Sequence, residues 1–365
     1  MRRRLNLILT TVIAIYCSTV AYPGLTFQSS ALQITDTCFE KKTIIITGVG
    51  DMMFGTLFPS PGYLPPGNNP YRLIENLIDT LRLSDITFGN LEGSFLDEGE
   101  PYKKCRDTSI CYLFRMPEKY AGLLRDAGFN LISLANNHFG DFGWKAAART
   151  KKLLDSLGIY FAGLTEHPYS IFRKDSVIYG FVAFAPTAGS VNLIDTAEAE
   201  SIVKTLSEEC DIVIVSFHGG AEGADFQRVP KTDEIFYGEN RGNVYDFAHR
   251  MIDSGADVIF GHGPHVTRAI EVYKERFISY SLGNFCTYGR FNIQGPNGFA
   301  PVIKLKVDRT GKFLSGRIIP IYQGHDGLVR TDSLGRAVKK IRELVALDFS
   351  DTEVYVSDDG KIFYK

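Results

Sequence analysis

The sequence lacks an excess of charge of either sign. Its 40 lysine and arginine residues are balanced by 42 aspartate and glutamate residues, so there is no basic footprint of the kind that binds nucleic acid. We therefore expect no nucleic-acid partner. Internal repeats and low-complexity tracts are also lacking, and the hydrophobic content of 44% is that of an ordinary soluble globular protein.

Long apolar runs are lacking as well. The run at residues 5–17 is shorter than the roughly 20 residues that span a bilayer. Arg2, Arg3 and Arg4 precede it and small residues follow through Ala21, which is the order of a secretory signal. We expect residues 1–21 to be a signal peptide or N-terminal anchor and the polar residues 22–42 to be a linker. The protein is then exported to the periplasm, the cell surface or the medium, and membrane association through the N-terminus stays open.

Cysteine is scarce, with six residues in the chain. Cys105 and Cys111 lie in a polar stretch and are expected to close a small loop, because disulfides persist outside the cytoplasm. A metal site is the alternative, although no second cysteine or histidine pair lies nearby. Cys38 has no evident partner, whereas Cys210 and Cys286 adjoin apolar strands and are expected in the core.

Strand-like and helix-like segments alternate along the rest of the chain, which predicts an α/β architecture in one domain. Strands are predicted at residues 43–49, 85–89, 129–135, 159–162, 177–185, 211–217, 258–260 and 276–281. Helices are predicted at residues 120–127, 144–157, 197–210 and 244–254. Residues 302–307 and 317–321 form a predicted hairpin. The domain is expected to cover residues 43–330, with a helix and strand at 331–365 as part of it.

Each of five apolar strands is followed by a polar residue that could bind metal. These residues are Asp51, Glu92, Asn137, His218 and His262. In α/β sheets, ligands collect at the carboxyl ends of strands, so side chains from most of the chain are expected to meet. Carboxylate, amide and imidazole donors together suit Mn, Fe, Zn or Co. Two such ions about 4 Å apart bind an anionic oxygen and lower the pKa of a bridging water.

Each residue taken alone has a structural interpretation. Asp51 could cap a loop, Glu92 could lie on a solvated turn, and the amides of Asn136 and Asn137 could stabilise a turn. A single histidine is more often a satisfied core residue than a ligand. The coincidence favours a site, because four of the seven histidines lie at strand ends within glycine-rich turns: His138, His218, His262 and His265. His167, His249 and His325 lack that setting and are expected to be structural or exposed.

Six sequence blocks, in order over roughly residues 43–290, resemble those of the CapA family of capsule and poly-γ-glutamate biosynthesis proteins. This family lies within the calcineurin-like metallophosphoesterase superfamily. The blocks are Gly50-Asp51-Met52-Met53-Phe54-Gly55, Asn90-Leu91-Glu92, Ser133-Leu134-Ala135-Asn136-Asn137-His138, His218-Gly219-Gly220-Ala221-Glu222, Gly261-His262-Gly263-Pro264-His265-Val266 and Ser281-Leu282-Gly283-Asn284-Phe285.

The resemblance implies a four-layer αββα sandwich, in which two facing sheets are flanked by helices and a dinuclear site lies between the sheet ends. It assigns as metal ligands Asp51, Glu92, Asn137, His218, His262 and His265. His138 is implied as the acid that protonates the leaving group or steadies its charge. Glu222 is implied either to bind a cationic or hydrogen-bonding part of the substrate or to support His218 from behind.

The blocks also depart from the wider superfamily. Met53 stands where that superfamily has a histidine, and Asn90 and Glu92 stand where it has a bridging aspartate. Losing a histidine ligand could weaken one metal or leave a mononuclear site, which puts ordinary phosphatase activity in doubt. Gly219 replaces the family's usual tryptophan and is expected to open space beside His218.

The leading hypothesis is an exported hydrolase, dependent on one or two divalent ions (Mn, Zn or Fe), that acts on an extracellular anionic polymer or its anchor. A non-catalytic polymer-binding or assembly protein with a weak metal site is the alternative, motivated by Met53. A periplasmic phosphodiesterase or nucleotidase is a third hypothesis. Residues 59–70 and 288–299 could form the rim of the cleft or be surface loops, and the sequence leaves both interpretations open.

Overall fold

The computed structural model describes residues 43–104 and 112–364. The predicted signal or anchor, the linker and the Cys105–Cys111 disulfide lie outside the described residues. Within those ranges, no helix has both the length and the apolar character needed to cross a membrane. All described residues belong to one unit, Lys41–Lys365.

The larger of two main sheets is built around a buried parallel core. Strand β1 (Ile44–Met53) pairs in parallel with β2 (Ile86–Leu91) and with β15 (Asn284–Thr287). The sheet continues in parallel on one side through β5 (Leu131–Ser133) and β6 (Tyr160–Ala162). On the other side it becomes antiparallel, through β16 (Phe299–Val307), β17 (Phe313–Gln323), β18 (Val329–Thr331), β19 (Val354–Val356) and β20 (Lys361–Tyr364). The predicted hairpin is therefore present and longer than expected.

The second sheet has six strands and brings in the middle of the chain. Its order is β13 (Ile270–Tyr273), β14 (Arg276–Ser279), β12 (Val258–His262), β9 (Ile212–His218), β8 (Val177–Phe184) and β7 (Tyr169–Lys174). Strands β8, β9, β12 and β14 are parallel, and every residue of β9 and β12 is buried. Burial on both faces explains why these strands are continuous apolar runs in the sequence.

The two sheets pack face to face. The ring of Phe88 on β2 stacks on that of Phe260 on β12, with centroids 5.1 Å apart, and lies 5.7 Å from Phe181 on β8. A Cβ atom on Gly48 would lie only 2.4 Å from the Phe260 ring. This close contact between layers is possible because Gly48 has no side chain.

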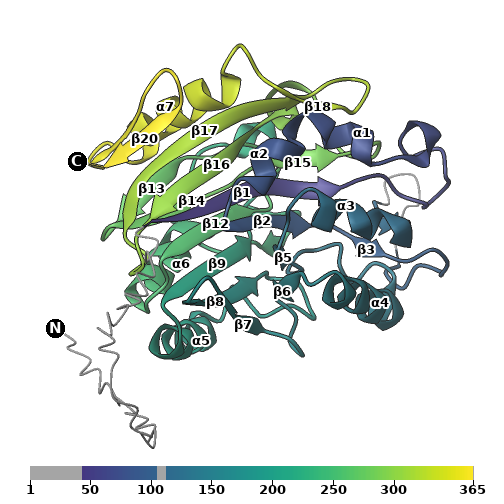
Figure 1. Cartoon of the computed structure of the whole chain (residues 1–365), viewed down its shortest axis with the longest axis horizontal. Helices are drawn as coiled ribbons and strands as arrows, with labels where there is room; N and C mark the ends of the chain where they lie inside the picture. The colour runs from purple at the N-terminus through teal and green to yellow at the C-terminus, as the bar shows by residue number, and fades with distance from the viewer. Residues whose placement is uncertain (1–42, 105–111, 365) are drawn as a thin grey trace, which may run out of the picture. The chain divides into compact units, whose positions relative to one another are not determined.

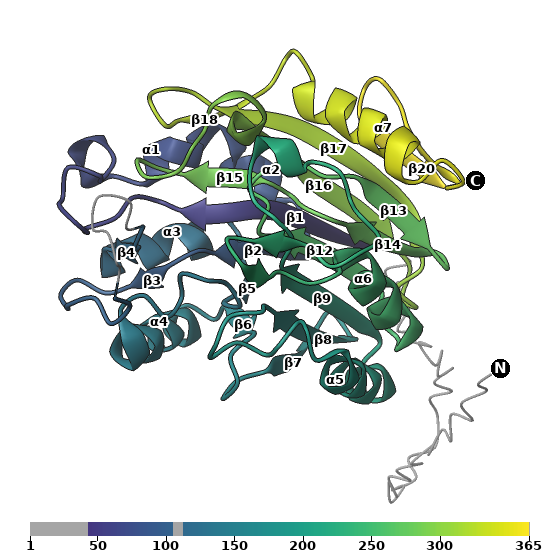
Figure 2. The ribbon, with the colours of Figure 1, turned by 180° about the vertical axis from the view of Figure 1, so that it is seen from behind.

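Helices cover the outer faces of both sheets (Figures 1 and 2). Helices α1 (Tyr71–Ile74), α2 (Ile78–Arg82), α3 (Ala121–Asp126) and α4 (Gly143–Ser156) share a hydrophobic cluster with the larger sheet. Helix α5 (Thr196–Glu209) packs on β8 and β9 and lies beside α6 (Val244–Asp253). Helix α7 (Arg336–Asp348) is not part of these outer layers: it packs on β16 and β17, contacts the edge strand β13 of the second sheet and shares the hydrophobic cluster of that sheet. The predicted four-layer αββα sandwich is confirmed.

Local chemistry fixes the starts of the two helices on the second sheet. The Asp195 side chain accepts a hydrogen bond from the Glu198 amide at 3.1 Å, and the Asn243 side chain accepts one from the Asp246 amide at 3.0 Å. Both are N-caps that satisfy an amide left without a partner in the first helical turn. Four short strands form two further pairs: β3 (Ser94–Phe95) with β4 (Arg115–Met116), and β10 (Ile235–Phe236) with β11 (Glu239–Asn240).

Candidate metal centre

The carboxyl ends of the parallel strands of both sheets carry the predicted site residues. Asp51 lies near the end of β1 and Glu92 directly follows β2. His218 and His262 are the last residues of β9 and β12 and are paired neighbours in that parallel ladder. The sandwich therefore brings together residues that are more than 200 positions apart in the chain.

The connection between β14 and β15 explains the glycines that precede two of these residues. The Asp51 amide donates to the Gly283 carbonyl at 2.9 Å, and the Leu282 amide donates to the Gly261 carbonyl at 3.0 Å. A Cβ atom on Gly50 would lie 2.0 Å from the Gly283 oxygen, and one on Gly261 would lie 2.4 Å from the Tyr280 oxygen. No side chain fits at either position, so glycine is required where the backbones approach.

Asp51 is the centre of the hydrogen-bond network. Its Oδ1 lies 2.9 Å from Asn90 Nδ2 and 3.1 Å from His262 Nδ1, while its Oδ2 lies 3.0 Å from His265 Nδ1. The side chain is fully buried. Burial alone would raise its pKa, but the hydrogen bonds and positive charges of His262 and His265 outweigh burial and hold the pKa of Asp51 well below its ordinary value.

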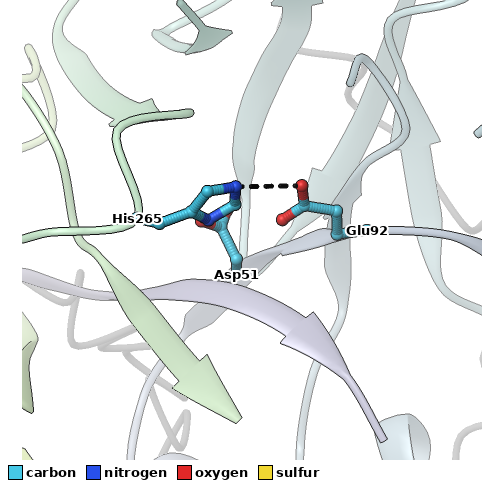
Figure 3. A group of neighbouring side chains, drawn as sticks. All are labelled: Asp51, Glu92 and His265. Atoms are coloured by element: carbon cyan, nitrogen blue, oxygen red, sulfur yellow. Dashed lines mark hydrogen bonds and ion pairs between the residues drawn. The ribbon is translucent and has the colours of Figure 1, made fainter. Parts of the chain in front are cut away.

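His265 joins Asp51 to Glu92 (Figure 3). Its Nε2 lies 3.5 Å from Glu92 Oε1, and its Nδ1 lies 3.1 Å from Asn284 Oδ1. The backbone of His265 has φ 55°, a left-handed conformation that is uncommon for residues other than glycine and clusters at functional sites. Burial opposes protonation, but the carboxylates of Glu92 and Asp51 outweigh it and raise the pKa of His265 to about 10.

Several buried ligand atoms around this network have no hydrogen-bond partner among the described residues. They are both carboxylate oxygens of Glu92, both ring nitrogens of His218, Nε2 of His262 and Oδ1 of Asn137. Burial raises the pKa of Glu92 well above its ordinary value despite the nearby His265 charge, and it lowers the pKa of His218 well below its own. Native proteins leave few buried polar groups unpaired, so this concentration points to a missing partner.

A divalent cation fits these atoms. Asp51, Glu92 and His265 each offer a ligand atom, and these three atoms lie within 4.8 Å of one another. A neutral His218, with one ring nitrogen that carries a free lone pair, is in the form that binds metal. Carboxylate, amide and imidazole donors together match a borderline divalent ion. The imidazoles of His262 and His218 adjoin these three residues, because His262 Nδ1 lies 3.1 Å from Asp51 Oδ1 and the His218 ring lies 6.2 Å from that of His265.

His138 lies in the turn after β5 and is oriented by a residue that the sequence analysis missed. Its Nδ1 is 2.9 Å from Asp141 Oδ2, and its ring centroid is 4.3 Å from that of Phe114. Asp141 is fully buried and also accepts a hydrogen bond from the Phe114 amide at 2.9 Å. Only the spacing of three residues from His138 could have indicated it, because Asp141 follows no strand.

The two neighbouring asparagines have different surroundings. Asn136 donates from Nδ2 to Asn90 Oδ1 at 3.1 Å and to the Leu91 carbonyl at 2.9 Å, and its Oδ1 accepts from the His138 amide. Asn136 therefore stabilises the turn, as one interpretation of the sequence allowed. The side-chain oxygen of Asn137 has no hydrogen-bond partner among the described residues. It is therefore free to bind a metal ion.

Glu222 does not hydrogen-bond to His218 in the described structure. Its Oε1 lies 2.9 Å from Arg241 Nη1. The loop that carries it is held by the fully buried Arg268, which binds both carboxylate oxygens of Glu234 at 2.8 and 2.7 Å. Glu234 in turn accepts from the Ala221 amide at 2.9 Å. This network was not predicted, because its members are far apart in sequence and follow no shared pattern.

The expected open space beside His218 is absent, so that expectation was wrong. A Cβ atom on Gly219 would lie 2.9 Å from Leu193 Cδ2 and 3.3 Å from Val244 Cγ1. These two side chains fill the volume that a tryptophan would need. Met53 is also fully buried, and its sulfur lies 3.3 Å from the Gly55 amide nitrogen.

The two loops with open interpretations both lie near the site. Phe291, from residues 288–299, stacks on Phe114 at 4.8 Å and packs edge-on against His265 at 5.2 Å. The guanidinium of Arg290 lies 5.0 Å from the ring of Tyr63, which belongs to residues 59–70. Residues 288–299 therefore border the site, and residues 59–70 pack against residues 288–299.

The other histidines, and the two cysteines among the described residues, are structural or exposed, as expected. His167 contacts Ser170 Oγ at 3.1 Å, His249 pairs with Glu271 at 2.9 Å, and His325 is exposed. Cys286 is buried and Cys210 is partly buried against the core.

The family model for the bacterial capsule synthesis protein PGA_cap matches residues 45–288. The capsule biosynthesis protein CapA of Bacillus anthracis is 27% identical over 268 residues, which cover 67% of this chain and 60% of that protein. The PGA biosynthesis protein CapA of Bacillus subtilis is 26% identical over 332 residues, which cover 87% of this chain and 80% of that protein. This chain thus spans about 60% of the length of the first of these relatives.

Solved structures are more distant. A hypothetical protein from Thermus thermophilus is 16% identical with a TM-score of 0.45, covering 79% of this chain and 100% of its own. A 5'-nucleotidase precursor from the same organism is 10% identical with a TM-score of 0.42, covering 84% of this chain and 59% of its own. Both scores are below 0.5, and no activity follows from them.

Proposed function

The chain belongs to the bacterial capsule synthesis protein family PGA_cap, and from this membership we propose that it is an exported, metal-dependent hydrolase of capsule or poly-γ-glutamate-type polymer biosynthesis, release or anchoring. The observation that carries the proposal is the group of buried ligand atoms on Glu92, Asn137, His218 and His262, which find no hydrogen-bond partner within residues 43–104 and 112–364, around an ionised Asp51. Export is supported by the order of residues 1–21.

The proposed ligands are Asp51, Glu92, Asn137, His218, His262 and His265, and Mn, Zn or Fe are the ions that suit them. One or two divalent ions held there supply Lewis-acid chemistry, in which a carbonyl or phosphoryl oxygen is polarised and water is activated. Asn90 and Asn284 orient Asp51 and His265 from behind.

His138 is the proposed acid. Because its Nδ1 hydrogen-bonds to Asp141, Nε2 is the nitrogen left to deliver a proton to a departing amine or alkoxide. The buried carboxylate of Asp141 stabilises the imidazolium form and fixes the ring, as a carboxylate does for a catalytic histidine. Phe114 packs against the ring and limits its rotation.

Turnover by the purified protein tests this proposal. We would supply Mn or Zn and measure cleavage of γ-linked polyglutamate and of phosphodiester model substrates, comparing the parent with His138→Gln. The proposal expects cleavage that requires the metal and falls about 10²-fold or more in the variant. Cleavage that is equal in both proteins, or equal without metal, would remove His138 and the metal site from the reaction.

A second candidate is a non-catalytic polymer-binding or assembly protein with a weak metal site. It is favoured by Met53, whose fully buried side chain offers no imidazole where the superfamily has one. Elemental analysis separates the two candidates. Substoichiometric metal after reconstitution, together with retained polymer binding, would favour the assembly role.

A further inference from the structure

An ion pair between Glu222 and Arg241 lies at the rim of the candidate metal centre. Arg241 Nη1 is 2.9 Å from Glu222 Oε1, and Arg241 Nη2 is 3.0 Å from Glu239 Oε2. The Arg241 side chain is 9% exposed, that of Glu222 is 23% exposed and that of Glu239 is 71% exposed. One buried guanidinium is therefore shared by two carboxylates, one largely buried and one at the surface.

Backbone hydrogen bonds fix both members of this pair beside the proposed ligands. The Gly223 amide donates to the Pro264 carbonyl at 2.9 Å, which places the neighbouring glutamate beside the loop that carries His265. The Arg241 carbonyl accepts from the Gly220 amide at 2.9 Å, in the turn that follows strand β9. The positions of both side chains are thus set by the same strand ends that set the metal centre.

The charges of the pair act on the proposed ligands. Burial is the largest cause that raises the pKa of Glu92, and nearby carboxylates, including that of Glu222, raise it further. Burial is also the largest cause that lowers the pKa of His218, and the positive charge of Arg241 acts in the same direction. Because Coulomb interactions between these groups are appreciable, the pair affects which charges the metal centre accepts.

A cavity of about 680 Å3 borders both the pair and the metal centre, since Arg241 and the proposed ligand Asn137 line its wall. The second cation of this wall, Lys103, lies 3.7 Å from Asp141 Oδ1. The two cations are therefore already paired with three carboxylates. The cavity that leads to the metal centre has no excess of positive charge to attract an anion.

A phosphoryl group would have to compete for Arg241. Arginine commonly binds phosphate oxygens through two parallel N–H groups, but both Nη atoms of Arg241 are bonded to carboxylates. Displacing Glu222 would leave a largely buried carboxylate without its partner, which is unfavourable. A neutral carbonyl group needs no such displacement and is not repelled by the carboxylates.

We propose that Glu222 is a specificity-determining residue, which neutralises Arg241 and so disfavours phosphoryl dianions at the metal centre relative to the neutral carbonyl of an amide or ester. The inference rests on the proposed function for the existence of the metal centre. It narrows that function from carbonyl or phosphoryl chemistry to carbonyl chemistry. An anionic polymer meets this requirement when the bond that reacts is an amide between its charged units, because the amide itself is neutral.

Inorganic phosphate is the probe that tests this inference. Its affinity for the whole protein, saturated with Mn, would be measured by calorimetry at a pH where phosphate is a dianion. In Glu222→Gln the side chain keeps its size and can still accept from Arg241, so charge alone is removed. We expect phosphate to bind about tenfold more tightly than to the parent, as for one unit charge nearby.

Glu200→Gln is the matched control. Glu200 Oε1 also lies 2.9 Å from an arginine Nη1, that of Arg250, but on helices α5 and α6 away from the metal centre. This variant should bind phosphate like the parent. A gain in Glu200→Gln equal to that in Glu222→Gln would mean that net charge, and not the pair at the rim, sets the affinity.

Two further variants identify Arg241 as the group that is released. Arg241→Met, added to Glu222→Gln, should remove most of the gain. Glu239→Gln changes an exposed side chain with little risk to folding, and it should strengthen phosphate binding several-fold because Arg241 loses its second carboxylate. Parental phosphate affinity in both single variants, or a gain that Arg241→Met does not diminish, would overturn the inference.

The outcome is separable from the fate of the proposed hydrolase, because elemental analysis reports bound Mn independently. A parent protein that binds no Mn would remove the metal-dependent hydrolase. The same titrations without metal would then decide the inference, since the gain expected in Glu222→Gln comes from Arg241. Metal-dependent cleavage with equal phosphate affinity in the parent and Glu222→Gln would support the hydrolase and reject the role of Glu222.

Discussion

Nδ1 of His265 lies 3.0 Å from Oδ2 of Asp51, although 214 positions separate the two residues in the chain. The contact joins the end of the first strand of one sheet to a loop that follows a strand of the other. Asp51 also contacts His262, and His265 also contacts Glu92. The candidate site is therefore a property of the interface between the two sheets.

Removing one imidazole should test the metal assignment. His218→Ala is expected to weaken metal binding at least tenfold, since loss of even a supporting group costs about 10–100-fold in metal affinity. Competition with a chelator, followed by elemental analysis, measures the change. His325→Ala is the matched control, because His325 is exposed and outside the site. Equal metal affinity in His218→Ala and the parent would show that the site is misassigned.

Asp141 should matter for turnover but not for metal. Asp141→Asn keeps the size of the side chain but cannot stabilise a charged His138, so kcat is expected to fall about 10²-fold or more. Metal content should stay at the parental level. The double variant with His138→Gln should be no worse than His138→Gln alone, because both changes remove one function. A multiplicative loss in the double variant, or a loss of metal in Asp141→Asn, would contradict the proposed orientation of His138.

Gly50 should tolerate no side chain. Gly50→Ala places a Cβ atom 2.0 Å from a backbone oxygen, and the shift needed to relieve it should destabilise the fold by about 3 kcal/mol. Denaturant unfolding measures this difference. Gly62→Ala is the control, because Gly62 is exposed and its nearest neighbour is a serine side chain at 3.4 Å. A parental midpoint for Gly50→Ala would mean that the connection at Gly283 does not lie against β1.

A buried carboxyl remote from the site should give the fold a pH dependence. Burial raises the pKa of Asp257 to about 7, although the Val213 amide and Arg276 oppose the shift. Between about pH 4 and pH 7 the folded protein then holds a proton that the unfolded chain has lost, so the free energy of unfolding falls as pH rises.

The Asp257→Asn variant isolates this contribution. The asparagine oxygen can still accept the hydrogen bond from Val213 at 2.8 Å, while the titration is removed. The parent should therefore lose stability relative to the variant as pH rises through this window, by up to about 4 kcal/mol at 1.36 kcal/mol per pKa unit. Parallel stability curves for the two proteins from pH 4.5 to 7.5 would refute the assignment.

Strand ends could be predicted from sequence because buried parallel strands are continuous apolar runs, and the residue where polarity returns marks their carboxyl end. This logic located Asp51, Glu92, His218 and His262. It could not locate Asp141, Arg268 or Glu234, because their roles depend on side-chain partners from distant segments. Strand β7 was missed because it is mostly exposed and not an apolar run. Strand β15 was missed because its four residues, Asn284–Thr287, begin and end with polar side chains and do not form an apolar run.

The most direct test of the central claim is anomalous scattering from crystals of the protein grown with Mn or Zn. We predict one or two peaks at the strand ends, with Asp51, Glu92, His218 and His262 among the ligands. An ion bound elsewhere, or no peak between these side chains when the metal is present in excess, would contradict it.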